Sequence, residues 1–485
     1  MSTLLPYRTP IEVLSHEEIL QVHKAVLEVL KDPGINVQHE ELLSILEKAG
    51  ADVDYRKQIV HLPPSLVERA IARAPSEVTY YGRDPRFDMT PGFGREIHTG
   101  SCHGAFFVED LETGERRPAT KKDVEDLTRL LDALPNVHYI YDEVIPQDVP
   151  AQFSNAHIAQ AMFNNTAKFC VVPAFNQSHA RAAIKMGTAV AGSADALRKR
   201  PIMTISNGWE PPLTLNQGRV EVILELCRAG IPIQLYSGGL AGASAPVTLA
   251  GATVQTVAEV IAGVTIVQTV NPGNPVRAYT LCAVMDQKYY GAVVAGPENS
   301  LMAVAGNQMM RFYHLPSKAF IFATASPVLN LQAAYEHTQG VLFAALSGAD
   351  LVASGIQSII DSNFTALYEV PIIFNEIWEM VYRIIQGVEV NSDTLAVNVI
   401  REVGPGGNYL THRHTRQFVK KEYWRPKIGT RLRREEWERM GARDIREVAR
   451  EEARRILATH RPIPLDQDVQ NKLQQIVDEV EAGKI

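Results

Sequence analysis

Three aromatic side chains are the first residues in this chain whose types and spacing suggest chemistry. Trp209, Tyr236 and Tyr279 each fall at or just past the end of a β-rich run, and the three runs follow one another in the sequence. Aromatic faces that converge on one cavity attract cations, above all quaternary ammonium groups, which cannot donate hydrogen bonds. The alternative is that each ring simply packs beneath a loop. Taken together, the three residues predict a cation-binding cavity.

Other residues that resemble known catalytic or metal-binding motifs are less informative. His412 and His414 have no third His, Cys or carboxylate at ligand spacing, so we expect no tightly bound metal in this chain. Cys102 and His103 are neighbours on a β-rich run, where successive side chains point to opposite faces, so a thiolate–imidazole pair is not expected. The glycines in SGGLAGAS miss the spacing of a dinucleotide-binding loop and favour a tight turn instead.

The elements that must position these residues alternate regularly along the chain. A short β-rich run is followed by a helical pattern, and this pair recurs eight times. The β-rich runs are residues 97–103, 137–144, 168–173, 201–206, 231–237, 276–282, 319–324 and 350–354. Helical patterns follow at residues 121–133, 153–164, 179–191, 216–229, 247–269, 298–313, 331–347 and 371–387.

Eight such units predict an α/β fold of the TIM (β/α)8 barrel type. A doubly wound parallel sheet is the competing arrangement, since it also alternates strands and helices. In a barrel the active site lies at the carboxyl ends of the strands, which we call the mouth. We expect three regions: an N-terminal helical cap over 1–95, the barrel over 96–390, and a C-terminal loop and helical extension over 391–485.

Composition and charge narrow the classes of partner. The chain has 485 residues, with 48 Lys and Arg against 55 Asp and Glu, a net charge of −7. This balance argues against nucleic-acid binding, which depends on massed Lys and Arg. Four scattered cysteines form neither a disulfide framework nor a zinc motif. We expect no membrane span and no signal peptide, and therefore a soluble, cytoplasmic protein.

The region beyond residue 390 has a different character. A glycine-rich loop, VGPGGNYLTHRHT, leads into the highly charged stretch RLRREEWERMGARDIREVAREEARRIL. A solvated helix face with ion pairs four residues apart is the simplest explanation. A contact between subunits is the other, and on this basis we expect a homo-oligomer.

Several long segments carry a resemblance to a known family. They are VEDLETGERRPAT at 108–120, GGLAGASAPVTLAGATVQTVAEVIAG at 238–263, QAAYE at 332–336, GPGGNYLTHRHT at 404–415 and WRPKIGTR at 424–431. In these the sequence resembles the trimethylamine methyltransferase family of corrinoid-dependent enzymes. The family fold is a TIM barrel, in agreement with the strand count.

The resemblance implies transfer of a methyl group from an amine to the cobalt(I) corrinoid (cobalamin) of a separate corrinoid protein. Members specific for trimethylamine carry pyrrolysine inside the barrel, whereas this chain contains only standard residues. Members without pyrrolysine resemble methyltransferases for quaternary amines, of which glycine betaine is the best-known substrate. Loss of a methyl group from a quaternary ammonium releases a neutral amine, so we expect no catalytic acid or base. Cobalt(I) is oxidised readily, which also argues for a reducing compartment.

A betaine substrate would also need hydrogen-bond donors for its carboxylate. The candidates at the mouth are His103, Asn176, Asn207 and Ser326, and Tyr409 or His412 could reach over from the C-terminal loop. Together with Trp209, Tyr236 and Tyr279, these residues form the predicted substrate site.

Two other functions remain open from the sequence. One is a barrel lyase or isomerase acting on a small organic acid, for which Asp142 and Glu143 are the best candidate bases. The other is a non-catalytic protein that binds a quaternary amine.

Overall fold

A closed ring of eight parallel strands lies at the centre of the computed structural model, which describes residues 10–91, 97–321 and 324–485. The strands are β4 (His98–Gly100), β7 (Val137–Tyr141), β8 (Phe169–Val172), β9 (Met203–Gly208), β11 (Ile233–Ser237), β13 (Val276–Thr280), β16 (Lys318–Phe320) and β17 (Leu351–Ala353). They pair in the order β13-β11-β9-β8-β7-β4-β17-β16, and a parallel bridge between Ala278 and Ser317 closes the ring. The predicted (β/α)8 barrel is confirmed, and every predicted strand segment overlaps a barrel strand.

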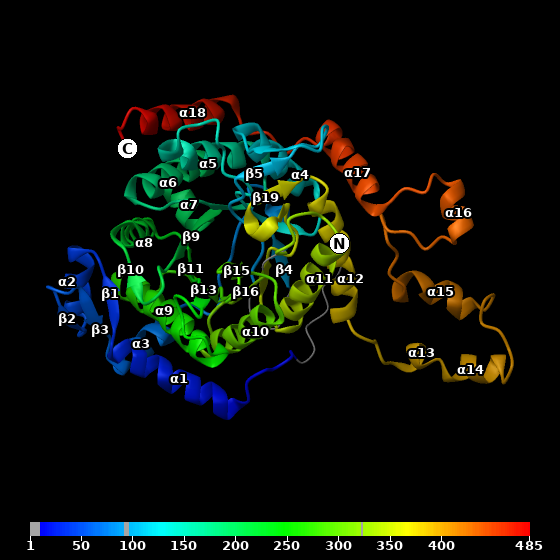
Figure 1. Ribbon diagram of the computed structural model, residues 1–485, viewed down its shortest axis with the longest axis horizontal. Coiled ribbons are helices and arrows are strands. Elements are labelled where there is room, and N and C mark those ends of the chain that lie inside the picture. Colours follow the sequence, from blue (N-terminus) through cyan, green and yellow to red (C-terminus); the bar gives the residue numbers. More distant parts are fainter. Residues whose placement is uncertain (1–9, 92–96, 322–323) are drawn as a thin grey trace.

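Helices surround the barrel, as Figure 1 shows. They are α4 (Lys121–Ala133), α5 (Ser154–Asn165), α6 (Gln177–Ala191), α7 (Ala194–Lys199), α8 (Gln217–Ala229), α9 (Leu249–Val270), α10 (Pro297–Phe312), α11 (Leu331–Leu346) and α12 (Val370–Ile385).

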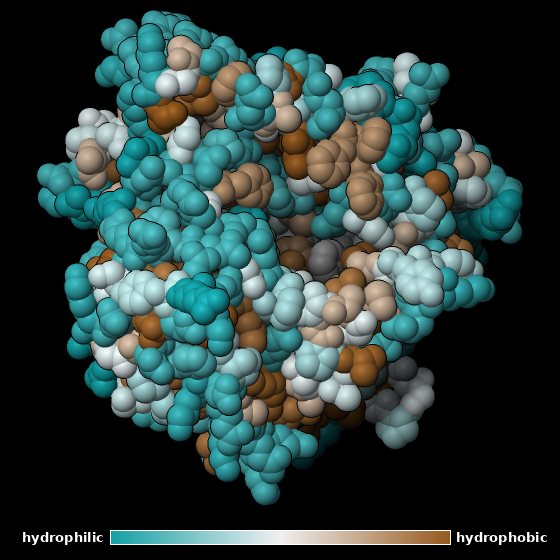
Figure 2. All heavy atoms as spheres, turned by 60° about the vertical axis from the view of Figure 1, so that its left-hand side comes forward, coloured by the Kyte–Doolittle hydropathy of each residue, from teal (hydrophilic) through white to brown (hydrophobic). Residues whose placement is uncertain are grey.

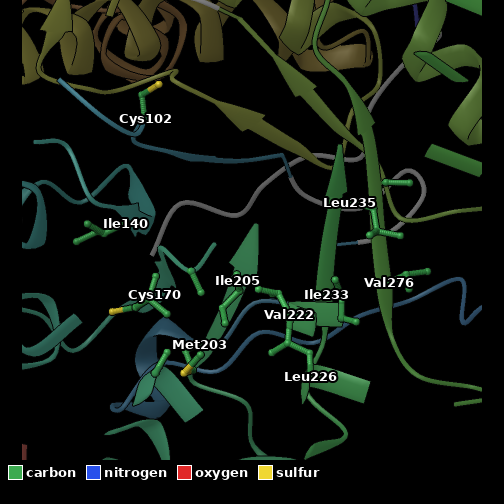
Figure 3. Packing of buried hydrophobic residues seen from close by; sticks show 14 of the residues in the cluster. Cys102, Ile140, Cys170, Met203, Ile205, Val222, Leu226, Ile233, Leu235 and Val276 are labelled. Atoms are coloured by element: carbon green, nitrogen blue, oxygen red, sulfur yellow. The ribbon is translucent and has the colours of Figure 1, made fainter. Parts of the chain in front are cut away.

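The strands alternate between an apolar outer face and an inner face that carries the site. Ile205 of β9 and Ile233 of β11 are paired in register and lie beside Val222 and Leu226 of α8 (Figure 3). Because successive side chains on a strand point to opposite faces, residues such as Tyr236 project into the barrel interior. Burial of the outer faces against the helices therefore fixes which residues reach the cavity.

Two small sheets decorate the loops that follow the barrel strands. One contains β12 (Leu240–Ala241), β14 (Ala283–Met285) and β15 (Ala292–Val293). The other contains β18 (Ile359–Ile360), β19 (Thr365–Leu367), β5 (Phe107–Glu109) and β6 (Arg116–Pro118), paired in that order. Both sheets lie on the mouth side of the barrel because they follow the carboxyl ends of strands.

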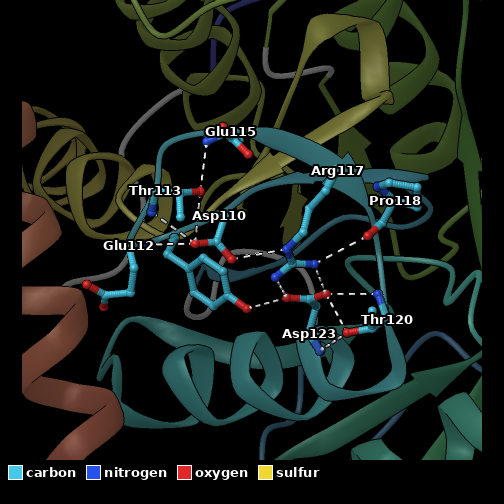
Figure 4. Close-up of polar contacts among 9 residues, drawn as sticks. Asp110, Glu112, Thr113, Glu115, Arg117, Pro118, Thr120 and Asp123 are labelled. Atoms are coloured by element: carbon cyan, nitrogen blue, oxygen red, sulfur yellow. Dashed lines mark hydrogen bonds and ion pairs between the residues drawn. The ribbon is translucent and has the colours of Figure 1, made fainter.

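An arginine holds the β5–β6 hairpin onto α4 (Figure 4). The Arg117 guanidinium donates to both carboxylate oxygens of Asp123, at 2.7 and 2.9 Å, and to Asp110 at 3.1 Å. The hydroxyl of Tyr368 donates to the same Asp123 carboxylate at 2.7 Å. The segment 108–120, which carries part of the family resemblance, is therefore a structural brace beside the mouth.

The N-terminal region contains strands that the sequence pattern does not predict. The expected helices are present as α1 (His16–Lys31), α2 (Glu40–Lys48) and α3 (Pro64–Arg73), but β1 (Ile35–Val37), β2 (Asp52–Asp54) and β3 (Ile59–His61) lie between them. Together with β10 (Thr214–Leu215) from the barrel loops they form a sheet in the order β10-β1-β3-β2. Strands of three residues are too short to show a periodic signal.

The helix α9 packs between the barrel and the N-terminal region. It contacts α1 and α3 on one side and β11 and β13 on the other. Within the residues that the structure describes it is the one helix long and apolar enough to cross a membrane, yet 78% of its most apolar stretch is buried inside the protein. Its composition is therefore explained by its place in the core. Hydrophilic side chains cover most of the face shown in Figure 2, where hydrophobic ones gather in separate patches.

The end of the barrel opposite the mouth is filled by side chains. Tyr80, from a short β-bridge with Met89, stacks on Phe169 of β8 at a centroid distance of 4.1 Å. The Arg277 Nε donates to the Tyr80 hydroxyl at 3.0 Å from inside the barrel. A bound molecule must therefore sit toward the mouth.

The C-terminal region divides into two parts. The helices α17 (Ile445–Thr459) and α18 (Gln467–Glu481) pack against the barrel helices, α17 on α12 and α4, and α18 on α5 and α6. Between α12 and α17 the chain leaves the body as a long excursion containing α13 (Ser392–Leu395), α14 (Val397–Val403), α15 (Arg413–Glu422) and α16 (Arg434–Arg439), seen in Figure 1. We call residues 388–444 the arm.

Candidate functional site

A cavity of about 120 Å³ opens at the mouth of the barrel. Pockets for drug-sized ligands measure about 300–1,000 Å³, so this one suits a molecule with few heavy atoms. Its walls come from most of the barrel strands and are largely apolar. The lining residues are Cys102, His103, Tyr141, Asp142, Val171, Val172, Pro173, Ala174, Phe175, Ser206, Tyr236, Tyr279, Leu281, Phe320 and Asn363.

Three aromatic rings on neighbouring strands form one wall of this cavity. Tyr236 of β11 lies 5.5 Å from Tyr279 of β13, and Tyr279 lies 6.2 Å from Phe320 of β16, with nearly parallel planes. Gly208 makes room for this wall, because a Cβ at that position would overlap the Tyr236 ring. Aromatic rings that line a cavity can attract a bound cation.

A lysine lies directly beneath the aromatic wall. Lys318 is two residues before Phe320 on β16 and is almost completely buried. Its Nζ lies 4.1 Å from the Tyr279 ring centre and donates to the Tyr141 hydroxyl at 2.5 Å. Burial lowers the pKa of Lys318 well below the ordinary value, and the positive charge of Arg277 acts in the same direction. Burial beneath the cavity therefore shifts this amine toward its neutral form.

On the other side of the cavity a histidine is paired with a buried carboxylate. The Nδ1–H of His103 donates to Asp142 at 2.8 Å, and its imidazole is half-exposed at the mouth. Burial alone would lower the pKa of His103, but the charge of Asp142 and its hydrogen bond together raise it above the ordinary value. When it is protonated, His103 can donate its second N–H to an anionic group in the cavity.

Behind this pair lies a second buried acid. Glu143 accepts the backbone N–H of Cys102 at 2.9 Å and that of Ser358 at 2.6 Å. Burial raises the pKa of Glu143 to about 7, although these hydrogen bonds oppose the shift. Burial also raises the pKa of the Cys102 thiol to about 12, so this thiol stays protonated and is a poor nucleophile.

An unusual turn brings one further residue to the cavity. Asp361, Ser362 and Asn363 have positive φ angles of 58°, 50° and 73°, a conformation that costs free energy for residues other than glycine. The backbone N–H groups of Asp361 and Ser362 donate to the carbonyls of Ser326 and Thr324, which holds the turn in place. The Asn363 amide then faces the cavity, 3.9 Å from the Cys102 sulfur.

The structure brings three of the nine predicted substrate residues into the cavity: His103, Tyr236 and Tyr279. Trp209 is instead buried against Gly263 of α9, so Phe320 rather than Trp209 completes the aromatic wall. The Asn207 side chain donates to the Arg219 carbonyl at 2.8 Å on the outer face of β9.

The remaining predicted residues have structural contacts outside the cavity. Asn176 caps α6 by accepting the His179 N–H, and the Ser326 hydroxyl donates to the Val328 carbonyl. Tyr409 and His412 lie on the arm, where the Nδ1 of His412 caps α15. The cavity-lining residues that the predicted substrate site lacks include Phe320, Asn363, Tyr141 and Ser206. Among the residues that the structure describes, no group of three or more His, Cys, Asp or Glu side chains is placed to hold a metal ion.

Comparisons with known proteins agree on one family. The family model for trimethylamine methyltransferase (MTTB) matches residues 3–483. The trimethylamine methyltransferase MttB of Desulfitobacterium hafniense (strain DSM 10664 / DCB-2) is 33% identical over 467 residues, covering 96% of this chain and 93% of the relative. MttB of Methanosarcina barkeri (strain Fusaro / DSM 804) is 31% identical over 437 residues, which cover 88% of this chain and 87% of that relative.

A relative that is named for a different substrate is similar over nearly the same length. The glycine betaine methyltransferase of Desulfitobacterium hafniense (strain Y51) is 28% identical over 419 residues, covering 86% of this chain and 87% of the relative. Among solved structures, the monomethylamine methyltransferase MtmB of Methanosarcina barkeri aligns with 94% of this chain and 95% of its own, with a TM-score of 0.48 and 10% identity.

Proposed function

Because the chain belongs to the trimethylamine methyltransferase family, we propose that it takes a methyl group from a quaternary amine and passes it to a corrinoid carried by a partner protein. Membership of the family makes it an enzyme, a methyltransferase. Glycine betaine or a similar betaine is the substrate we propose. The lyase and the non-catalytic binding protein considered from the sequence receive no comparable support.

The aromatic wall of the cavity is the observation that carries this proposal. Tyr236, Tyr279 and Phe320 place three adjacent aromatic rings along a small, mostly apolar space. A quaternary ammonium gains from such faces and needs no hydrogen-bond acceptor. Among the described residues that line the cavity, Asp142 is the one carboxylate, and it is already engaged by His103.

The chemistry that this cavity must support requires little from the side chains beyond binding. The corrinoid supplies the cobalt nucleophile when its carrier protein is bound. The amine that leaves a quaternary ammonium is neutral, so no side chain has to protonate it. The aromatic wall holds the trimethylammonium head, and His103 and Asn363 hold the carboxylate of a betaine. Holding the head in one orientation supplies the proximity on which the reaction depends.

The rim of the mouth supports a protein partner. Exposed apolar and aromatic side chains stand on the loops that follow β4, β8, β11, β13, β16 and β17. They are Phe106, Phe175, Val247, Tyr289, Tyr290, Val328, Leu331 and Phe364. Aromatic residues that surround a cavity are typical of a surface that binds another protein. The corrinoid protein that we propose would dock there, with its cofactor over the cavity.

The cellular location follows from the same chemistry. Cobalt(I) is stable only in a reducing environment, and all four cysteines, Cys102, Cys170, Cys227 and Cys282, are free and buried. Disulfides are rare in reducing compartments. We therefore propose that the enzyme works in the cytoplasm.

The experiment that tests this function measures methyl transfer directly. The purified protein is mixed with a cobalt(I) corrinoid under anoxic conditions, and glycine betaine, carnitine, proline betaine, choline or trimethylamine is added in turn. We expect the absorbance to change from that of cobalt(I) to that of methylcobalt(III) with a betaine. No change with any quaternary amine, also after candidate corrinoid proteins are added, would overturn the proposal. A response to trimethylamine alone would show that the substrate is a tertiary amine and not a quaternary one.

A further inference from the structure

The arm, residues 388–444, projects from the body of the molecule. Its four helices α13 to α16 contain no buried residue, and Figure 1 shows them projecting beside α12. Isolated helices shorter than about 12–15 residues are marginal in water, and the longest of these four has 10 residues. Another surface must therefore cover them if they are to keep this conformation.

The root of the arm is held firmly on α12. The Glu376 carboxylate accepts the backbone N–H groups of Lys427, Ile428 and Gly429 at 2.6, 2.8 and 2.9 Å. Lys421 pairs with Glu389 at 2.6 Å. This ion pair joins the segment of the arm that leaves the body to the segment that returns to it. These contacts give the arm a defined direction, so it presents a fixed surface.

A series of exposed apolar side chains extends from α12 along the first part of the arm. Its side chains are 41–69% exposed. They are Met380, Ile384, Val388, Val390, Leu395, Val397 and Ile400. Because this series begins on a barrel helix, whatever covers the arm also contacts the body beside it. Large apolar surfaces that are exposed on a protein often mark a site of interaction with another protein.

The charge of the arm is opposite to that of the rest of the chain. The arm has twelve Lys and Arg against eight Asp and Glu, which gives +4. Because the whole chain carries −7, the remainder carries −11. A second copy of this chain therefore offers the arm a body of opposite sign, and complementary charge favours association.

We propose that the arm and the outer face of α12 form an interface with a second copy of this chain, each arm lying against the body of the other copy. The series from Met380 to Ile400 forms the apolar centre of this interface, and the basic residues of the arm face the acidic body. The arm has 57 residues, more than the roughly 20–30 residues that a stable interface uses on each side. A pairing in which both copies exchange the same element closes with two-fold symmetry.

The test is the mass of the full-length protein in solution, measured by native mass spectrometry and by light scattering at micromolar concentration. The wild type should be a homo-oligomer. The double variant Leu395→Asp, Ile400→Asp should associate at least tenfold more weakly, because it places charges in the apolar centre. Leu20→Asp is the matched control, since Leu20 is 45% exposed on α1, away from the arm, and should leave the mass unchanged.

A second variant tests the interface in case the first variant fails to fold. Arg413→Glu with Arg416→Glu reverses two exposed charges on α15 without touching an apolar side chain. It should weaken association, and the wild-type oligomer should weaken as salt is added. A monomeric wild type, or unchanged association in both variants, would overturn the proposal. So would a wild type that stays monomeric alone and loses only its binding of a corrinoid protein when the arm is changed.

Discussion

Replacing Tyr279 by leucine tests the aromatic wall most directly. Tyr279 is the middle ring, 5.5 Å from Tyr236 and 6.2 Å from Phe320, and it is 3% exposed. Leucine removes the ring face but leaves an apolar side chain in the same space. We expect the variant to fold and to bind a quaternary ammonium more weakly.

The magnitude follows from the energy of a cation against one ring face. A desolvated contact of this kind contributes about 0.5–2 kcal/mol. Since about 1.4 kcal/mol corresponds to a tenfold change in affinity, Tyr279→Leu should weaken the binding of glycine betaine by about 2- to 30-fold. Tyr236 and Phe320 remain in place, so binding should not be abolished.

Calorimetry with two ligands separates the cation effect from a change of shape. The second ligand is 3,3-dimethylbutanoate, which has the shape and carboxylate of glycine betaine with a carbon in place of the charged nitrogen. Tyr279→Phe is the matched control variant: it keeps the ring and loses only the hydroxyl, which lies 3.0 Å from the Ser206 hydroxyl. We expect Tyr279→Leu to lower the affinity for glycine betaine and not that for 3,3-dimethylbutanoate, whose head is uncharged, and Tyr279→Phe to change neither by more than about twofold.

Two results would refute this reasoning. If Tyr279→Leu weakened both ligands equally, the ring would act by filling space and not by attracting a cation. If neither ligand lost affinity, the substrate would not contact this wall. Trp209→Phe should leave betaine affinity unchanged, because Trp209 lies outside the cavity. A loss in that variant would return Trp209 to the substrate site.

Three further predictions concern the titratable groups around the cavity. Asp142→Asn should lower the pKa of His103, since Asp142 is what raises it, so betaine affinity measured by calorimetry across about pH 5–8 should begin to fall at a lower pH than in the wild type. Lys318→Met should flatten the pH profile of choline binding. In the wild type this affinity should rise as pH climbs through the lowered pKa of Lys318, because the protonated amine repels a cation above it. Burial raises the pKa of Glu143 to about 7, so the folded protein has its full stability below the pKa of the unfolded chain, about 4.5. As pH rises from there through 7, the free energy of unfolding should fall by about 3 kcal/mol. Glu143→Gln cannot ionise and should not show this fall. Urea denaturation on both sides of that range measures the difference between wild type and variant.

Much of the fold is readable from the sequence because its signals are local. The helix α1 begins after Ser15, whose side chain forms a capping box with Glu18, and the following chain turns at Gly34 with a φ of 80°. The eight barrel strands are short but carry apolar outer residues, and each is followed by a helix of ordinary length. The strands β1 to β3 were not predicted, because their pairing with one another and with β10 joins segments that are far apart in the sequence.

The predicted site was less complete because a barrel mouth depends on where each strand ends. The seventh β-rich run was placed at 319–324, which put Ser326 at the mouth, whereas β16 ends at Phe320. Because every second residue of a strand points inward, an end that lies four residues earlier changes which inward-facing residues reach the mouth. Phe320 therefore lies at the mouth, where the prediction had placed later residues. Asn207 follows inward-facing Ser206 and therefore points outward, an alternation that the sequence already contained. Asn363 depends on a left-handed turn that no local pattern announces.

A pattern in the three neighbouring strands could have identified the complete wall. Each has a polar residue two positions before an aromatic one: Gln234 before Tyr236, Arg277 before Tyr279, and Lys318 before Phe320. Polar residues on a strand usually mark the solvent face, but here they lie on the inner face with the rings, because the outer face is covered by helices.

The consequence is a layer of polar groups under the rings, in which Tyr141 donates to Gln234 at 2.9 Å and Lys318 donates to Tyr141. This layer fixes the floor of the cavity by hydrogen bonds. Two of its members, Arg277 and Lys318, have basic side chains, and a fully charged layer would oppose a quaternary ammonium bound above it. Burial lowers the pKa of Lys318 and so shifts it toward its neutral form. A neutral lysine does not repel a cation, so the burial of Lys318 makes the aromatic wall above it more suitable for a quaternary ammonium.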